Sequence, residues 1–142
     1  MDHDTSTQPA ALAEWVIDQV ADALIYADRG GRIVRWNQAA SRLFGFSHEE
    51  AMGASLDLII PEHLRAAHWA GYDAAFASGR LKLDGRPTPT RGVHRDGRKL
   101  YVEMSFALVC DEGGTAIGSV AMARDVTERV ERERAARQAR AT

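Results

Sequence analysis

The chain has little cysteine, no long apolar run and no strong excess of either charge. Its 142 residues contain 1 cysteine, Cys110, which excludes an internal disulfide framework and a cysteine-based metal centre. No apolar run approaches the roughly 18 residues that a membrane span needs. The 18 basic and 20 acidic residues leave a formal charge of −2, too weak to hold nucleic acid or an anionic membrane. We therefore expect a cytoplasmic chain that binds neither nucleic acid nor membranes.

Signatures of catalysis are also missing. The sequence has no glycine loop of the kind that cradles phosphate, and no Ser/His/Asp or Cys/His set at a suggestive spacing. The pair Glu49 and Glu50 is better explained as acidic residues in the first turn of a helix. We therefore expect that this chain is not an enzyme.

The length and the 45% hydrophobic content indicate one domain with tails. Residues 1–8 are polar and are expected to be a disordered lead. Apolar residues at helical spacing predict an amphipathic helix over 9–22, residues 23–124 form the expected domain, and the charged stretch 125–142 predicts a connecting helix.

Within the domain, alternation of apolar and polar residues predicts strands on both sides of a helical segment. Asp28-Arg29-Gly30-Gly31 separates two β-rich runs and predicts a hairpin. Short helices are expected between 37 and 60. A meander of three further strands is expected after the helices. Its first strand has β-rich runs at 81–83 and 90–94, with an edge or bulge where prolines fall in 85–89, and the other two cover 99–108 and 115–123. The pattern predicts an α+β fold with one five-stranded antiparallel sheet and helices on one face.

The stretch Pro61 to Gly79 is expected to be a helix that carries a histidine on its inward face. Leu64, His68, Gly71, Tyr72 and Ala75 recur at spacings of three and four, so they share one stripe. An imidazole on an apolar face is a suitable ligand for heme iron, and small residues beside it leave room for a flat cofactor. The alternative is a core histidine that is hydrogen-bonded to a neighbour.

Several segments in order resemble PAS sensory domains. ALIYADRGGRIVRWNQAASRLFGFSHEEAMGASLDLIIPE, the later HRDGRKLYVEMSFA and the closing RDVTERVERE together resemble the family over about residues 20 to 130. The resemblance implies the PAS fold and a role in sensing and signal transduction.

The segment PEHLRAAHWAGY resembles the corresponding helix of heme-binding PAS domains in oxygen-sensing histidine kinases. The resemblance implies heme b with His68 as the proximal iron ligand. It also implies that Met104, Phe106 and Leu83 line the opposite, gas-binding side, and Leu64 and Tyr72 complete the expected cofactor contacts. Two positions depart from the pattern, because the arginines of those sensors correspond here to Thr88 and Ala74.

The expected function is therefore a heme sensor for a diatomic gas (O2, CO or NO) or for a redox change. The signal is expected to pass through the junction 125–127 to an output domain or partner protein, and the amphipathic helix 9–22 is expected to pair two copies in a homodimer. The alternative is a PAS domain for dimerisation or protein interaction that holds no cofactor, or one that binds FAD. Blue-light adduct chemistry is not expected, because residues 40 to 60 contain no cysteine. Cys110 is expected to be a small buried residue.

Overall fold

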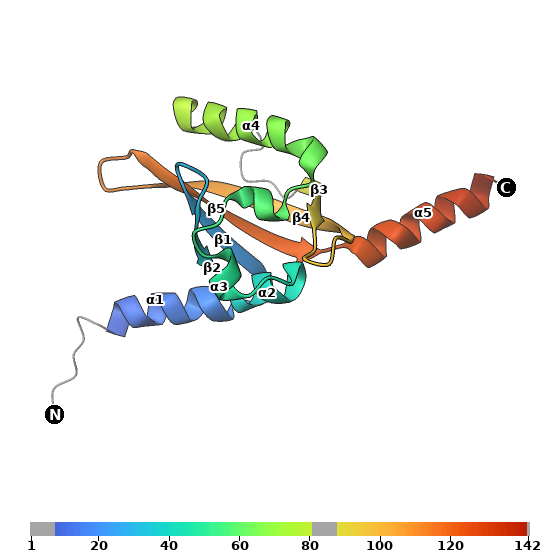
Figure 1. Cartoon of the computed structure of the whole chain (residues 1–142), viewed down its shortest axis with the longest axis horizontal. Helices are drawn as coiled ribbons and strands as arrows, with labels where there is room; N and C mark the ends of the chain where they lie inside the picture. The colour runs from blue at the N-terminus through green and yellow to red at the C-terminus, as the bar shows by residue number, and fades with distance from the viewer. Residues whose placement is uncertain (1–7, 81–87, 142) are drawn as a thin grey trace.

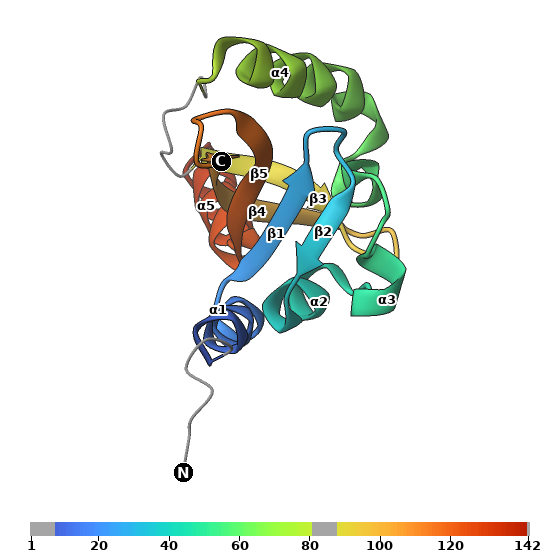
Figure 2. The ribbon, with the colours of Figure 1, turned by 90° about the vertical axis from the view of Figure 1, so that its left-hand side faces the viewer.

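One antiparallel sheet with helices on one face organises the chain, and a further helix stands at each end (Figures 1 and 2). The computed structural model describes residues 8–80 and 88–141. Its elements are α1 (Gln8–Gln19), β1 (Ala23–Asp28), β2 (Ile33–Trp36), α2 (Gln38–Phe44), α3 (His48–Ala51), the 3₁₀ turns η1 (Leu56–Ile59) and η2 (Glu62–Leu64), α4 (Arg65–Ser78), β3 (Thr88–Val93), β4 (Lys99–Cys110), β5 (Ala116–Asp125) and α5 (Thr127–Ala141).

The sheet has 5 strands in the order β2-β1-β5-β4-β3, and every neighbouring pair is antiparallel. The first and last strands of the chain lie side by side, with Ala23 opposite Ala123. Along β1 every second residue is buried, at Ala23, Ile25 and Ala27, and these side chains face the helices. The predicted α+β fold with one five-stranded sheet is confirmed.

The turn between β1 and β2 is shaped to receive a helix. The Asp28 carboxylate accepts a hydrogen bond from the backbone N–H of Arg32 at 3.0 Å. Gly31 has φ +82°, and a side chain there would collide with the ring of Trp69 on α4. Glycine is therefore required both by the backbone and by the close approach of the helix.

Buried Asn37 joins α1, β1 and α2. Its Oδ1 caps α2 by accepting from Ala40 N at 2.9 Å and also accepts from Leu24 N at 2.9 Å. Its Nδ2 donates to the carbonyls of Ile17 at 2.9 Å and Asp22 at 3.1 Å. All four hydrogen-bonding positions of this amide are used, which fixes the end of α1 on the domain.

The segment predicted as one helix from Pro61 to Gly79 has two parts. Its first turn is the 3₁₀ turn η2, and the α-helix α4 begins at Arg65. Tighter 3₁₀ turns are common at helix N-termini. Here Arg65 donates from Nε to the Ile60 carbonyl at 3.0 Å, which holds the turn against η1. The helix ends as predicted at Gly79, with φ +73°.

Some predictions concern parts of the chain away from the core. The prediction for Cys110 is wrong, and others fall on residues that the structure does not describe. Cys110 was expected to be buried, but it is exposed, because it lies at the end of β4 beyond a break in register between Val109 and Cys110. The predicted strand at 81–83 lies outside the described residues, as does nearly all of the predicted lead 1–8.

The end helices differ in how they meet the domain. In Figure 1, α5 projects away from the sheet, while α1 lies at the end of the molecule opposite α4. On α1, three large apolar side chains are at least half exposed: Leu12, Trp15 and Val16. No helix formed by the described residues is both long and apolar enough to cross a membrane.

Candidate functional site

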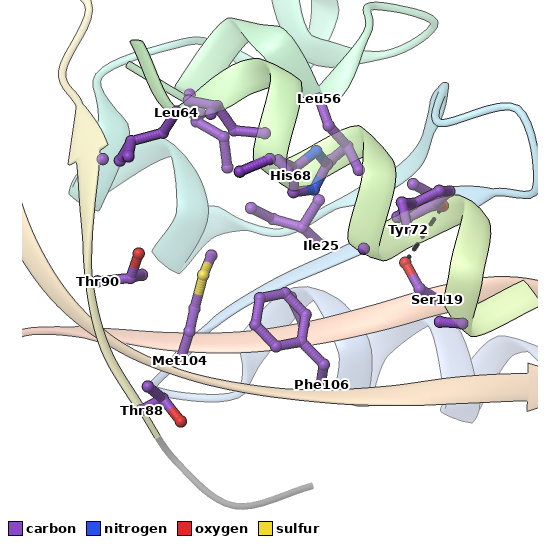
Figure 3. Close-up of a pocket in the computed structure, with 18 of the residues that line it drawn as sticks. Ile25, Leu56, Leu64, His68, Tyr72, Thr88, Thr90, Met104, Phe106 and Ser119 are labelled. Carbon is purple, nitrogen blue, oxygen red and sulfur yellow. Dashed lines mark hydrogen bonds between the residues drawn. The ribbon is translucent and has the colours of Figure 1, made fainter. Parts of the chain in front are cut away.

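A cavity of about 850 Å³ separates α4 from the sheet. Figure 3 shows His68 and Tyr72 of α4 on one side of it, with Met104 and Phe106 of β4 facing them. Ile25 of β1 and Leu56 of η1 also line it. Its size falls within the roughly 300–1,000 Å³ of small-molecule and cofactor sites, and its lining is mostly apolar as in those sites.

Five of the six predicted cofactor-contacting residues line this one cavity. They are Leu64, His68, Tyr72, Met104 and Phe106. The sixth, Leu83, lies outside the described residues. The stripe predicted on α4 is also present, because Gly71 and Ala75 line the cavity beside His68 and Tyr72.

The alternation of β4 places its side chains at this site. Val102 and Met104 are buried on the helix-covered face, and Phe106 follows on the same face. On the edge strand β3, Thr88 lies opposite Met104 and Thr90 lies opposite Val102. Both threonines line the cavity, so β3 contributes hydroxyl groups where the resemblance led us to look for an arginine.

His68 lacks a hydrogen-bond partner for one buried ring atom. Among the described residues, Nδ1 of His68 is the one side-chain nitrogen or oxygen atom that is fully buried without a hydrogen-bond partner. The other ring nitrogen, Nε2, is not fully buried. Because His68 lines the cavity, Nε2 is the ring nitrogen that is accessible from the cavity. Burial lowers the pKa of the imidazole, and the negative charge of Asp57 partly offsets that effect. Burial therefore favours the neutral imidazole, which is the form that binds metal, and the tautomer with its proton on Nδ1 would leave a lone pair on Nε2.

Aromatic rings and one carboxylate hold the His68 side of α4. The His68 ring lies edge-on to Trp69, with centroids 4.6 Å apart, and is 5.6 Å from Tyr72. Trp69 donates from Nε1 to Oδ1 of Asp57 at 2.7 Å, and the same oxygen is 3.9 Å from Nε of Arg65. His63, the nearest other histidine in sequence, is exposed and does not line the cavity.

Tyr72 connects α4 to two strands. Its hydroxyl donates to the Asp28 carbonyl at 2.6 Å. The same hydroxyl accepts from Ser119 Oγ on β5 at 3.3 Å (Figure 3). Burial raises the pKa of the Tyr72 phenol, which keeps it protonated as a donor. Sequence reasoning missed Ser119, although its place in the alternation of β5 is a signal that a polar group faces inward.

The residues present fit a heme. The cavity offers the Nε2 atom of an imidazole, apolar walls on both sides and an open face at Gly71, where an added Cβ would meet nothing within 4 Å. The second ring nitrogen of the same imidazole is orphaned, which a purely structural histidine would avoid.

Comparison with known proteins gives the family. A family model described as the PAS fold matches residues 17–131. The chain belongs to this family, and its class is that of a PAS sensor domain.

Three curated relatives extend the comparison. The chain is 24% identical over 86% of its length to the oxygen sensor protein DosP of Escherichia coli, and 27% identical over 80% to the sensor protein FixL of Bradyrhizobium diazoefficiens. It is 31% identical over 84% of its length to an uncharacterized protein of Azorhizobium caulinodans. The chain spans only 15%, 22% and 16% of these proteins respectively.

Solved structures have the same fold. The PAS domain of a Colwellia psychrerythraea protein superposes with a TM-score of 0.73 at 22% identity, covering 85% of this chain and 99% of that one. An RNA-binding light-oxygen-voltage receptor also gives a TM-score of 0.73, at 26% identity, covering 97% of this chain and 38% of that one. Relatives of more than one sensory type are thus similar to this chain.

Proposed function

We propose that this PAS domain binds heme b through His68 and senses a diatomic gas or a redox change. The observation that carries the proposal is the imidazole of His68, which lines an apolar cavity of about 850 Å³ and has its Nδ1 buried without a partner. The similarity to DosP, named as an oxygen sensor, supports the same function. The resemblance of the helix PEHLRAAHWAGY to the corresponding helix of heme-binding sensors supports His68 in particular.

Each lining residue has a separate task in this proposal. His68 holds the iron through Nε2, and Leu64 and Tyr72 cover the same side from α4. Met104 and Phe106 face the opposite side, where their apolar surfaces exclude water. When bound, the heme supplies an iron that takes O2, CO or NO, or that changes oxidation state.

The signal has a direct route from α4 to the output helix. Tyr72 lies one turn after His68 and is hydrogen-bonded to Ser119 of β5. That strand runs into α5 at Thr127, whose hydroxyl accepts from Tyr101 N at 2.9 Å on β4. Movement of His68 is therefore passed to the 125–127 junction through bonded neighbours rather than through a loop.

Hemin titration tests the proposal. Purified protein is mixed with hemin, and the Soret band is recorded for the wild type, His68→Ala and His63→Ala. His63 is the matched control because it is exposed and lies outside the cavity lining. The proposal predicts a shifted Soret band in the wild type and in His63→Ala, and its loss in His68→Ala. The absence of a protein-dependent band in the wild type contradicts it.

A flavin is the second candidate ligand, and the light-oxygen-voltage receptor at 26% identity favours it. FAD in the same cavity gives a yellow protein with absorbance in the blue, whereas heme gives a Soret band. The protein as purified therefore separates the two. A domain that binds neither serves dimerisation or protein interaction.

Two further features belong to the proposal. Leu12, Trp15 and Val16 on α1 are at least half exposed, and a homodimer that pairs the two copies of α1 buries them. We also propose that this domain is cytoplasmic and not itself catalytic, so that its output is carried by a partner or by another domain.

A further inference from the structure

The hydrogen bonds around Ser119 run in one direction. The Tyr72 hydroxyl donates to the backbone carbonyl of Asp28 at 2.6 Å. A carbonyl oxygen has no hydrogen to give, so the hydrogen of the Tyr72 hydroxyl is committed to this bond. Tyr72 can therefore only accept from Ser119 Oγ, which lies 3.3 Å away (Figure 3). The hydrogen of the Ser119 hydroxyl is in turn committed to Tyr72.

Ser119 consequently lines the cavity as a hydrogen-bond acceptor. A serine hydroxyl has one hydrogen and two lone pairs, and here Tyr72 takes the hydrogen. The residue lines the cavity and is 8% exposed. A buried lone pair in a mostly apolar cavity is stabilised by an N–H or O–H donor, and a second acceptor placed against it is repelled. Ser119 therefore favours a ligand that carries a donor.

The other hydroxyl groups of the cavity impose no such direction. Thr88 and Thr90 line it from β3, where they lie opposite Met104 and Val102 of β4. A threonine hydroxyl can donate as well as accept, so these two positions suit either kind of polar group on a ligand. The acceptor character of Ser119 is what gives the cavity a preference.

The walls of the cavity indicate the body of the ligand. Phe106 of β4 faces His68 and Tyr72 of α4 across the cavity (Figure 3), and flat rings pack well against such aromatic side chains. No Asp or Glu lines the cavity in the part of the chain that the structure describes, and its two arginines, Arg80 and Arg91, are exposed. A charge inside the cavity would be left without a partner, which disfavours an ionic ligand.

We propose that the heme-free domain binds a flat, uncharged aromatic molecule that carries an N–H or O–H donor, and that Ser119 accepts the hydrogen bond from this donor. The inference does not rest on heme binding, and a ligand of this class competes with heme for one cavity. The volume of about 850 Å³ is ample for three fused rings. Ser119 is thereby the residue that selects ligands by their polarity.

Two probes of the same shape test the polarity of the site. Carbazole has a central N–H donor, and dibenzofuran has an oxygen acceptor at the same place. Equilibrium dialysis against the purified heme-free protein measures the Kd of each probe. The wild type should bind carbazole about tenfold more tightly than dibenzofuran, because only carbazole satisfies the buried acceptor. Equal affinity for the two probes, or binding of neither, overturns the proposal.

Serine variants assign the preference to one residue. Ser119→Ala removes the acceptor and should bind the two probes equally. Ser105→Ala is the matched control and should keep the preference for carbazole, because Ser105 lies on the neighbouring strand β4 and does not line the cavity. A preference that is kept in Ser119→Ala and lost in His68→Ala means that the imidazole is the acceptor, and it contradicts the role given to Ser119.

Two further variants test the direction of the hydrogen bonds and the place of binding. Tyr72→Phe frees the hydrogen of Ser119, which can then also donate, so the preference for carbazole should shrink; an unchanged preference contradicts the direction argued for these bonds. At Gly71 an added Cβ meets nothing within 4 Å, so leucine fits there and fills part of the cavity. Gly71→Leu should weaken the binding of both probes, and unchanged affinity would place them elsewhere and overturn the proposal. Neither probe contains iron, so failure of the hemin titration leaves these outcomes intact.

Discussion

At the scale of single residues, His68 has a buried polar atom that destabilises the fold because it lacks a hydrogen-bond partner. A buried donor or acceptor left without a partner costs about 1–3 kcal/mol, and Nδ1 of His68 is such an atom. A histidine kept for packing alone would be replaced by an apolar side chain without loss. The cost is understandable if the other ring nitrogen has a task in the cavity that His68 lines.

Substitution of His68 by leucine should therefore separate stability from function. We expect His68→Leu to leave the free energy of unfolding of the ligand-free protein unchanged, or to raise it by up to about 1–3 kcal/mol, because it removes the unpaired atom. The same variant should lose the Soret shift with hemin. Urea denaturation followed by circular dichroism measures the first effect. A loss of stability of the size typical for core truncations would show that the imidazole is structural.

The sequence predicted the position of His68 but not the side-chain contacts around its ring. Spacing put Leu64, His68 and Tyr72 on one stripe, and the family resemblance gave the histidine its role. The hydrogen bond between Trp69 and Asp57 joins two elements through side-chain directions that a hydrophobic pattern does not contain, and the same holds for the burial of His68 Nδ1 without a partner. Cys110 was wrongly expected to be buried for a similar reason, since burial at a strand end depends on what covers it.

At the scale of elements, the docking of α4 depends on the β1–β2 turn. Trp69 lies against Gly31, Tyr72 donates to the Asp28 carbonyl, and Arg29 lies 5.5 Å from the ring centroid of Phe76. These three contacts keep α4 away from the sheet by the width of the cavity while fixing it at the turn.

Alanine at Gly31 should release this docking. Both Gly31 and Gly53 have φ +82°, so alanine is strained at either position, by about 1–2 kcal/mol. Only at Gly31 would the new Cβ collide with Trp69, and overpacking of that kind costs about 1–3 kcal/mol more. Gly31→Ala should therefore be more destabilising than Gly53→Ala by that difference in chemical denaturation. Equal losses in the two variants would show that Trp69 does not depend on the turn.

The start of α3 should make stability depend on acid. The Glu50 carboxylate accepts from Ser47 N at 2.9 Å in a capping box and pairs with Arg95 at 2.6 Å. The hydrogen bond from Ser47 is the main cause that lowers the pKa of Glu50 below its ordinary value of 4.5. A carboxyl group with a lowered pKa stabilises the fold fully above its ordinary pKa, and that stability is lost as the pH falls from there through the lowered value.

The measurement is the unfolding free energy of the wild type and of Glu50→Gln from neutral pH down to below 4.5, the ordinary pKa of this carboxyl. The wild type should be the more stable at neutral pH, and the two should converge in acid. Glu49→Gln is the matched control, because it removes the adjacent carboxylate and leaves the capping box intact. A constant difference between wild type and Glu50→Gln across this range would exclude the carboxylate as the cause.

The boundaries of elements were predictable where a local signal marks them. Asn37 and Ser47 are residue types that favour helix N-caps, and they cap α2 and α3, while Gly79 ends α4. The 3₁₀ turn over Glu62–Leu64 was missed, because Pro61 is equally compatible with the first turn of an α-helix and of a 3₁₀ helix. The difference depends on Arg65 reaching back to Ile60.

At the scale of the whole molecule, the strand order brings the site and the output helix together. Because β5 lies between β1 and β4, the strand that carries Ser119 also ends at the start of α5. Val126, at that junction, is buried and donates its N–H to the Tyr101 carbonyl at 2.8 Å. A shift of β5 therefore also moves the start of α5, the helix that projects from the sheet (Figure 1).

The Tyr72 hydroxyl should carry the ligand response to α5. In the heme-loaded wild type, binding of CO as a probe gas should change hydrogen–deuterium exchange in α5, and in Tyr72→Phe this change should be much reduced while the Soret band is kept. Tyr26→Phe is the matched control, since Tyr26 contacts β5 at Gly118 from the other face of the sheet. An unaltered response in Tyr72→Phe would contradict transmission through the bond to Ser119.

The sheet order could not be obtained from periodicity. Alternation predicted a hairpin and a meander, but the contact of Ala23 with Ala123 that joins them is a pairing between distant parts of the chain. The resemblance to PAS domains supplied that link, and the match of the PAS fold model to residues 17–131 agrees with it. The cavity follows from this strand order. The helix α4 crosses the sheet, and the turn between β1 and β2 holds the helix away from it.

The most direct test of the account is rescue of a His68→Gly variant by free imidazole. The glycine leaves room for imidazole at the position of the lost ring, and the cavity is already lined by Gly71 nearby. The hemin-loaded variant should lose the wild-type visible spectrum and regain it as imidazole is added, whereas imidazole should leave His63→Gly unchanged. A His68→Gly protein that keeps the wild-type hemin spectrum without imidazole would contradict His68 as the iron ligand.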